Sequence, residues 1–209
     1  MSTASLSRLA STVLYYLAAG AALAGSTAAL ATGQQTPAAP APAAKANDPT
    51  HAFDFFHGTW QAHNHRMVGR LVGSQKWEDF EAVVECHDLP GGTGNEDSYV
   101  TDFWPGFTGI TVRFLDRATQ KWSIYWASNK TGVLEPPVVG GFDADGVGIF
   151  EGDDVNNGKP VRVRYTWSRT RTAHPRWEQA MSPDGGKTWE TNWVMNFDRV
   201  ATTAKGTAP

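Results

Sequence analysis

The sequence predicts an all-β fold, an antiparallel up-and-down β-barrel of about ten strands. Three observations lead to this prediction. Short β-prone runs recur from residue 59 onward, turn residues separate them, and no amphipathic helix of convincing length occurs beyond a short lead-in at 48–57. Because a meander of consecutive antiparallel strands leaves two unpaired edges, closure into a barrel is the favoured arrangement.

The ten expected strands are short segments rich in aromatic and β-branched residues. The turns between them carry residues suited to positive φ, as in the Asp-Ala-Asp-Gly segment at 143–146 and the Asn-Asn-Gly segment at 156–158. In chain order, the expected strands are 59–68, 76–87, 98–104, 108–115, 121–128, 138–142, 146–152, 160–169, 176–182 and 189–199.

Several of these strands have one wholly apolar face. In segment 161–167, two Val, a Tyr and a Trp share one face, while two Arg and a Thr share the other. The pattern leaves open which stripe faces inward. Comparable stripes consist of Trp122, Ile124 and Trp126, and of Trp189, Thr191, Trp193, Met195 and Phe197.

The segment Ser-Pro-Asp-Gly-Gly-Lys-Thr-Trp at 182–189 matches the Asp-box pattern S-x-D-x-G-x-T-W. Asp and Gly tolerate the tight backbone of a hairpin turn, the hydroxyl groups can tie the turn internally, and the Trp can pin it to the sheet. A β-propeller would repeat the motif in each blade, but this chain has one copy. We therefore expect a structural turn and not a glycosidase site.

Longer segments carry a resemblance to a known family. They are the Phe-Asp-Phe-Phe-His-Gly-Thr-Trp segment at 53–60, with its G-x-W pattern, and the segments 134–140, 177–182 and 189–195. Over about residues 53–199 the chain resembles the DUF1579 family of bacterial proteins. The resemblance implies a lipocalin-like or fatty-acid-binding-protein-like (calycin-type) barrel and supplies no catalytic residue. The Gly-rich first-strand motif of the related nitrobindin-like haem barrels is absent, and we expect no cofactor.

Composition divides the chain into four parts. Residues 1–31 form an apolar, Ala-rich run after Arg8 with a small-x-small site at 29–31, which predicts a secretory signal peptide. An uncleaved N-terminal anchor is the alternative. Residues 32–50 form a disordered Pro/Ala-rich linker, residues 51–200 the barrel domain, and residues 201–209 a disordered polar tail. The mature protein is thus expected to be exported, either to the periplasm or outside the cell.

The charge balance excludes some partners. With 18 Lys and Arg against 21 Asp and Glu, the net charge is -3, which favours neither nucleic acid nor an anionic membrane surface. We expect no stable membrane insertion after signal cleavage, and the sequence does not define an oligomeric state. The single cysteine, Cys86, excludes an internal disulfide and is expected to be a small buried side chain.

Nine Trp, ten Phe and five Tyr predict either dense barrel packing or an aromatic pocket for a small hydrophobic molecule. The side chains expected to be shared between core and pocket are Trp126, Trp167, Trp177 and Trp193. Arg164, Glu178 and Asn192 could converge with Glu190 to orient a polar group of the ligand. Alternatively, these charged residues form a salt-bridge ladder on the outer face.

His63 and His65 share one strand face at a spacing that allows a common metal ion, although two hydrogen-bonded or solvated histidines are the alternative. The leading interpretation is an exported barrel that binds a small, largely apolar ligand. One alternative is a barrel enzyme, an isomerase, cyclase or hydrolase, that uses Glu178, Glu190, Asn192 or the histidines. Another is a structural or partner-binding secreted module.

Overall fold

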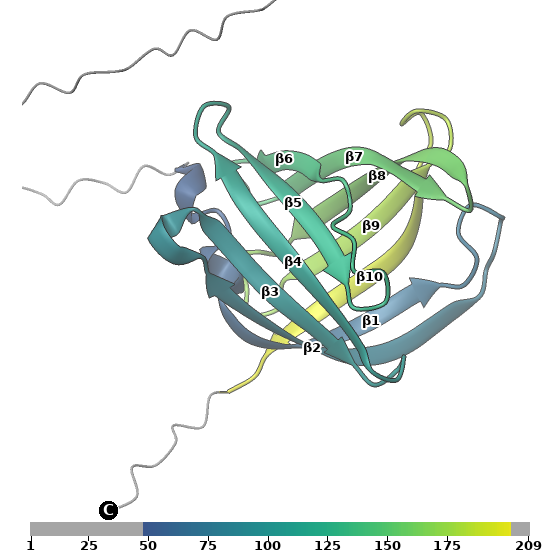
Figure 1. The fold of residues 1–209 in the computed structure, drawn as a ribbon, viewed down its shortest axis with the longest axis horizontal. Coiled ribbons are helices and arrows are strands. Elements are labelled where there is room, and N and C mark those ends of the chain that lie inside the picture. The colour runs from purple at the N-terminus through teal and green to yellow at the C-terminus, as the bar shows by residue number, and fades with distance from the viewer. Residues whose placement is uncertain (1–47, 202–209) are drawn as a thin grey trace, which may run out of the picture. The chain divides into compact units, whose positions relative to one another are not determined.

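The computed structural model describes residues 48–201, and the predicted signal peptide, most of the linker and the tail lie outside them. Ten antiparallel strands follow one another around a closed barrel, in which each strand pairs with its sequence neighbours and β10 closes on β1 (Figure 1). The strands are β1 (Gly58–Met67), β2 (Trp77–Asp88), β3 (Gly94–Thr101), β4 (Phe107–Asp116), β5 (Lys121–Ser128), β6 (Val138–Phe142), β7 (Gly148–Asn156), β8 (Lys159–Ser168), β9 (Arg176–Ser182) and β10 (Glu190–Arg199).

This architecture confirms the predicted all-β, antiparallel, up-and-down barrel of about ten strands. The two-residue period selects which side chains face inward. In β8, Val161, Val163 and Trp167 are buried, whereas the alternating Arg162 and Arg164 lie on the outer face. The stripe of Trp122, Ile124 and Trp126 on β5 also faces the interior.

The apolar stripe expected along β10 is wrong at its first two residues, Trp189 and Thr191. The register between β9 and β10 shifts between Thr191 and Trp193, which marks a β-bulge. The bulge reverses the phase of the strand, so Trp193 faces inward while Trp189 lies outside the barrel. The Trp189 ring is covered by the guanidinium of Arg164, whose central carbon is 3.9 Å from the ring centre.

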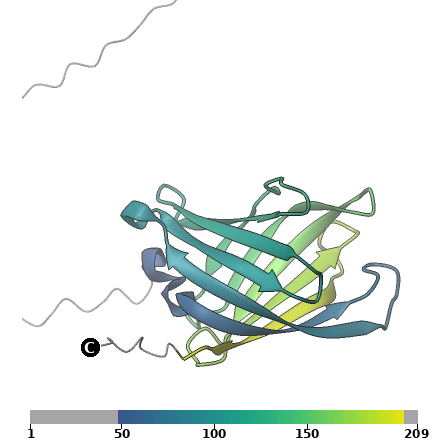
Figure 2. The same cartoon turned by 60° about the horizontal axis from the view of Figure 1, so that its bottom comes forward.

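The N-terminal lead-in packs against one end of the barrel (Figure 2). It consists of two 3₁₀ helices, η1 (Pro49–His51) and η2 (Asp54–Phe56). Phe53 and Phe56 are 1% exposed and fill this end with Trp60, whose Nε1 donates a 2.7 Å hydrogen bond to the Phe56 carbonyl. The Trp60 of the G-x-W pattern is therefore a packing residue that closes the barrel.

The opposite end, which we call the mouth, is bordered by the loops 68–76, 102–106, 129–137, 157–158 and 183–189. The β1–β2 loop reaches across it. Asn156 Nδ2 of β7 donates to the Arg70 carbonyl at 3.3 Å, and Glu190 Oε1 of β10 accepts from the Leu71 amide at 2.7 Å. Two hydrogen bonds from separate strands thus fix this loop.

The Asp-box at the mouth is a structural turn, as its sequence predicts. Asp184 accepts hydrogen bonds from the Thr188 hydroxyl at 2.7 Å and from the Thr188 and Lys187 amides at 2.9 and 3.0 Å. These donors hold the pKa of Asp184 well below its usual range, the Thr188 hydroxyl having the largest effect. Ser182 and Trp189 complete the turn by bonding to Gly186.

Two further expectations concern packing and membranes. Cys86 is 1% exposed, and burial raises the pKa of its thiol to about 12, so it is a buried, unreactive side chain. Within residues 48–201, none of the helices has the length and apolar character needed to cross a membrane.

Candidate ligand-binding site

The barrel encloses a cavity of about 630 Å³. Its wall includes the four tryptophans named from the sequence, Trp126, Trp167, Trp177 and Trp193. Trp177 and Trp193 meet edge to face with their ring centres 6.0 Å apart. Further apolar surface comes from Trp104, Phe107, Ile124, Met181, Met195 and Phe197. The interior is thus mainly aromatic, but it is not filled by its own side chains.

A glycine makes room for one of these rings. A Cβ atom on Gly109 of β4 would lie 2.0 Å from Cη2 of Trp126, closer than two carbon atoms can approach. The Trp126 ring therefore lies directly against the Gly109 backbone. Any larger residue at this position would push the ring away from its place in the cavity wall.

Asn64 is the centre of a buried hydrogen-bond network inside the barrel. It is 3% exposed, and its Oδ1 accepts 3.0 Å hydrogen bonds from the Tyr99 hydroxyl and from Trp193 Nε1. Its Nδ2 donates to the Ala62 carbonyl at 3.1 Å. These bonds fix the orientation of two cavity-lining rings, since a buried polar network that is fully bonded admits few arrangements.

A buried ion pair lies toward the closed end of the cavity. Arg113 bonds to Asp97 through Nη2 and donates from Nη1 to Asn95 Oδ1 at 2.9 Å. The Arg113 and Asp97 side chains are each 4% exposed. The guanidinium carbon is also 5.0 Å from the centre of the Phe53 ring and 5.5 Å from that of Phe56. The lead-in is thus attached to the barrel through a buried cation.

The mouth carries charges of both signs. Arg66 near the end of β1 and Arg70 in the following loop line the cavity. Glu135 and Asp154 also line it, beside Tyr165, and both interact electrostatically with Arg70, whose loop crosses the mouth to β7. Burial, followed by the charge of Asp154, raises the pKa of Glu135, and burial raises that of Tyr165.

Two of the polar residues predicted to contact ligand point away from the cavity. Arg164 lies on the outer face, where its Nε donates to Glu151 at 2.7 Å, and Glu178 accepts from Arg176 on the same face at 2.8 Å. Both residues alternate with inward-facing neighbours, so the two-residue period turns them outward. This correction favours the outer salt-bridge ladder, which was the alternative interpretation.

Asn192 faces inward but does not line the cavity. It is 0% exposed, and its Oδ1 accepts a 2.8 Å hydrogen bond from Nε2 of Gln179, which does line the cavity. Asn192 therefore orients a cavity residue. The predicted convergence of these carboxylates and this amide does not occur. Glu178 lies on the outer face, Glu190 at the rim and Asn192 inside the barrel.

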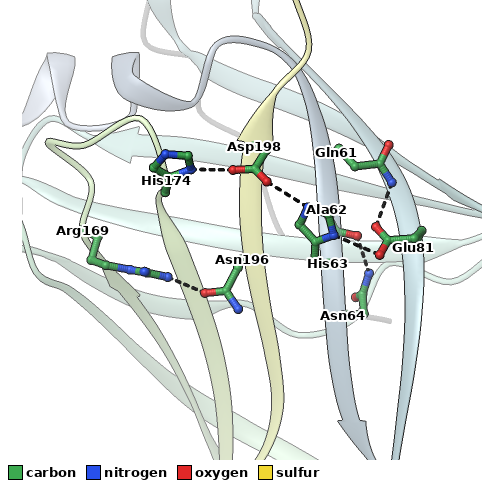
Figure 3. A network of polar contacts seen from close by, with 9 residues as sticks. All are labelled: Gln61, Ala62, His63, Asn64, Glu81, Arg169, His174, Asn196 and Asp198. Carbon is green, nitrogen blue, oxygen red and sulfur yellow. Dashed lines mark hydrogen bonds and ion pairs between the residues drawn. The ribbon is translucent and has the colours of Figure 1, made fainter.

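The two histidines proposed as metal ligands lie on the outer face. Figure 3 shows the contacts of His63. His63 bonds to Glu81 at 2.9 Å and to Asp198 at 3.0 Å, while His65 bonds to Asp79 at 2.7 Å. In the described part of the chain, no three His, Cys, Asp or Glu side chains form a group able to hold a metal ion. The arrangement gives the metal hypothesis no support, and it stays a prediction.

The sequence interpretation missed most of the polar cavity residues. Asn64 and Arg66 alternate along β1 with the same two-residue period as Trp60 and Ala62, which face inward. The sequence would therefore have indicated them as inward-facing once the inner face of this strand was known. Arg70 lies in a loop, and no local pattern in the sequence indicates that this loop crosses the mouth.

Comparison with known proteins does not identify a family for this chain. No family model and no curated protein matches the chain. One similar solved structure is the S-type phycobiliprotein lyase CPES from Guillardia theta, with 9% identity and a TM-score of 0.45. The match covers 72% of this chain and 91% of that chain. Membership of the DUF1579 family accordingly stays a prediction.

Proposed function

We propose that this protein is an exported carrier that binds a small, largely apolar ligand inside its barrel. The observation that carries the proposal is the unfilled aromatic cavity of about 630 Å³. Small-molecule sites are typically concave, mostly apolar and roughly 300–1,000 Å³ in volume, with few polar groups to orient the ligand. Export is proposed from the apolar N-terminal run and its small-x-small site.

The internal geometry supports a preformed site. The hydrogen bonds to Asn64 fix Tyr99 and Trp193, and the Gly109 backbone defines the position of Trp126. Rings held in this way lose little conformational entropy when a ligand enters. The acids, amide and histidines on which the enzyme alternative was based do not line the cavity, so that alternative gains no support from the site.

The proposal is tested with a panel of fatty acids, retinoids, sterols, flavonoids and porphyrins. A binder should change the intrinsic Trp emission and raise the melting temperature, because a ligand that binds only the folded state stabilises it. At a hundredfold excess over Kd, the gain is about 2.7 kcal/mol. If no member of the panel gives either signal, the carrier proposal fails.

Two matched variants locate the binding. Trp193 lies in the cavity wall, whereas Trp189 lies outside the barrel beneath Arg164. Trp193→Phe should lose a substantial part of the ligand-induced emission change, and Trp189→Phe should retain it. The reverse pattern would place the ligand on the outer surface and would refute binding inside the barrel.

A further inference from the structure

Two arginines at the mouth of the cavity are incompletely paired. Among the described residues, no hydrogen bond or ion pair reaches the Arg70 guanidinium, although its backbone carbonyl is held by Asn156. Arg66 forms one ion pair, through Nη1 to Glu78, and its buried Nε has no hydrogen-bond partner. Such groups normally find partners when removed from water, so donors are available here for a ligand.

Both cations lie against aromatic rings of the cavity wall. The Arg66 guanidinium carbon is 5.0 Å from the Trp104 ring centre and 5.5 Å from that of Trp193, and the Arg70 carbon is 5.6 Å from the Trp193 ring centre. Burial, followed by the charge of Arg66, lowers the pKa of Arg70. The protein thus holds two like charges together in a partly desolvated place.

From this geometry we infer that Arg66 and Arg70 form an anion subsite, so that the ligand is an amphiphile with an aromatic or apolar body and one carboxylate or sulfonate group. This inference rests on the proposed carrier function and specifies its ligand class. The anionic group would accept hydrogen bonds from both guanidinium groups at the mouth. The apolar body would extend inward along Trp193 toward the aromatic interior.

Two carboxylates at the mouth limit where the anionic group can bind. Glu135 and Asp154 interact electrostatically with Arg70 and would repel an anion, so the anionic group is expected on the side of Arg70 that faces Arg66. Toward the closed end, Arg113 also has a buried Nε without a hydrogen-bond partner, but its two Nη atoms bond to Asp97 and Asn95, so that cation is a weaker competitor for the anion. Lys130 also lines the cavity, but it is a single cation whose Nζ donates to the Pro105 carbonyl at 3.3 Å. Arg66 and Arg70 are two neighbouring cations, so an anionic group gains most beside them.

The experiment uses two fluorescent probes with the same aromatic body. 1-Anilinonaphthalene-8-sulfonate carries a sulfonate, whereas N-phenyl-1-naphthylamine lacks it. The unmodified protein should bind the sulfonate probe more tightly. Arg70→Met should weaken the binding of this probe about tenfold or more, the value of a lost charge-assisted hydrogen bond, and should leave that of the neutral probe within about twofold. Arg117→Met, which alters a cation in the closed-end loop 117–120, is the matched control and should change neither.

The outcomes separate the two claims. If both probes bind with equal affinity to the unmodified protein and Arg70→Met weakens neither, the anion subsite is refuted while the carrier function stands. If neither probe binds to the interior, both claims fail. Should Arg70→Met not fold, Arg70→Gln replaces it, and the affinity ratio of the two probes for the unmodified protein tests the inference without any variant.

Discussion

Replacement of Asp97 by Asn tests whether the buried ion pair near the closed end fixes the barrel. The substitution keeps the shape of the side chain and removes its charge, which leaves the Arg113 cation with two phenyl rings and only neutral amide oxygens, those of Asn95 and of the introduced side chain. Both partners are 4% exposed, so water cannot compensate for the lost carboxylate. Breaking a buried pair on one side typically costs about 3–5 kcal/mol.

That cost is large relative to the total stability of a domain, which is about 5–15 kcal/mol. At roughly 2–4 °C per kcal/mol for a domain of this size, Asp97→Asn should lower Tm by about 6–20 °C. Urea unfolding followed by Trp emission measures the free-energy change directly. Asp153→Asn breaks an exposed pair with Arg162 and serves as the control, for which little change is expected.

A double variant completes the test. Asp97→Leu combined with Arg113→Met replaces both charges by apolar groups and should recover most of the stability lost in Asp97→Asn, because no unpaired charge remains. The reasoning is refuted if Asp97→Asn costs less than about 1 kcal/mol, the range typical of an exposed pair.

Three more predictions concern the turn, the outer face and the cavity wall. The pKa of Asp184 is depressed in the folded state, so its contribution to stability is present above pH 3.8 and is lost as the pH falls below that value. In Asp184→Asn, Tm should therefore fall less when the pH is lowered below 3.8, and the affinity for the probes should not change. Hydrogen bonds, chiefly to Glu81, raise the pKa of His63 in the folded state. Its contribution to stability is therefore present below pH 6.5 and is lost as the pH rises through the folded pKa. His63→Gln should reduce the fall in Tm between about pH 5 and pH 8. Gly109→Ala should push the Trp126 ring from its place and weaken probe binding, at a stability cost of about 1–3 kcal/mol; unchanged affinity would show that this ring does not shape the site.

The strand pattern was readable from the sequence because a two-residue period and turn chemistry are local properties. Three of the expected strands have the same bounds as the observed β5, β6 and β9, namely 121–128, 138–142 and 176–182. The alternation of Val161, Val163 and Trp167 indicated an apolar face. The direction of that face follows from how all ten strands close, which is not a local property.

The candidate site was predicted only in its aromatic part. The four tryptophans are large and apolar, so burial in the barrel was foreseeable from their chemistry. Arg164 and Glu178 are separated from inward-facing residues by one position, and the choice between the two faces depends on strand phase. The bulge beside Asn192 changed that phase in β10, and nothing in the local sequence specified where the extra residue would fall.

The methionine methyl groups provide the most direct measurement of the central claim, that ligand binds inside the barrel. Met181 and Met195 line the cavity, whereas Met67 is buried but does not line it. In a protein labelled with ¹³C at the methionine methyl groups, titration with N-phenyl-1-naphthylamine should shift the Met181 and Met195 signals saturably through the ring current of the probe, and leave the Met67 signal in place. Saturable probe fluorescence without movement of the Met181 and Met195 signals would contradict an internal site.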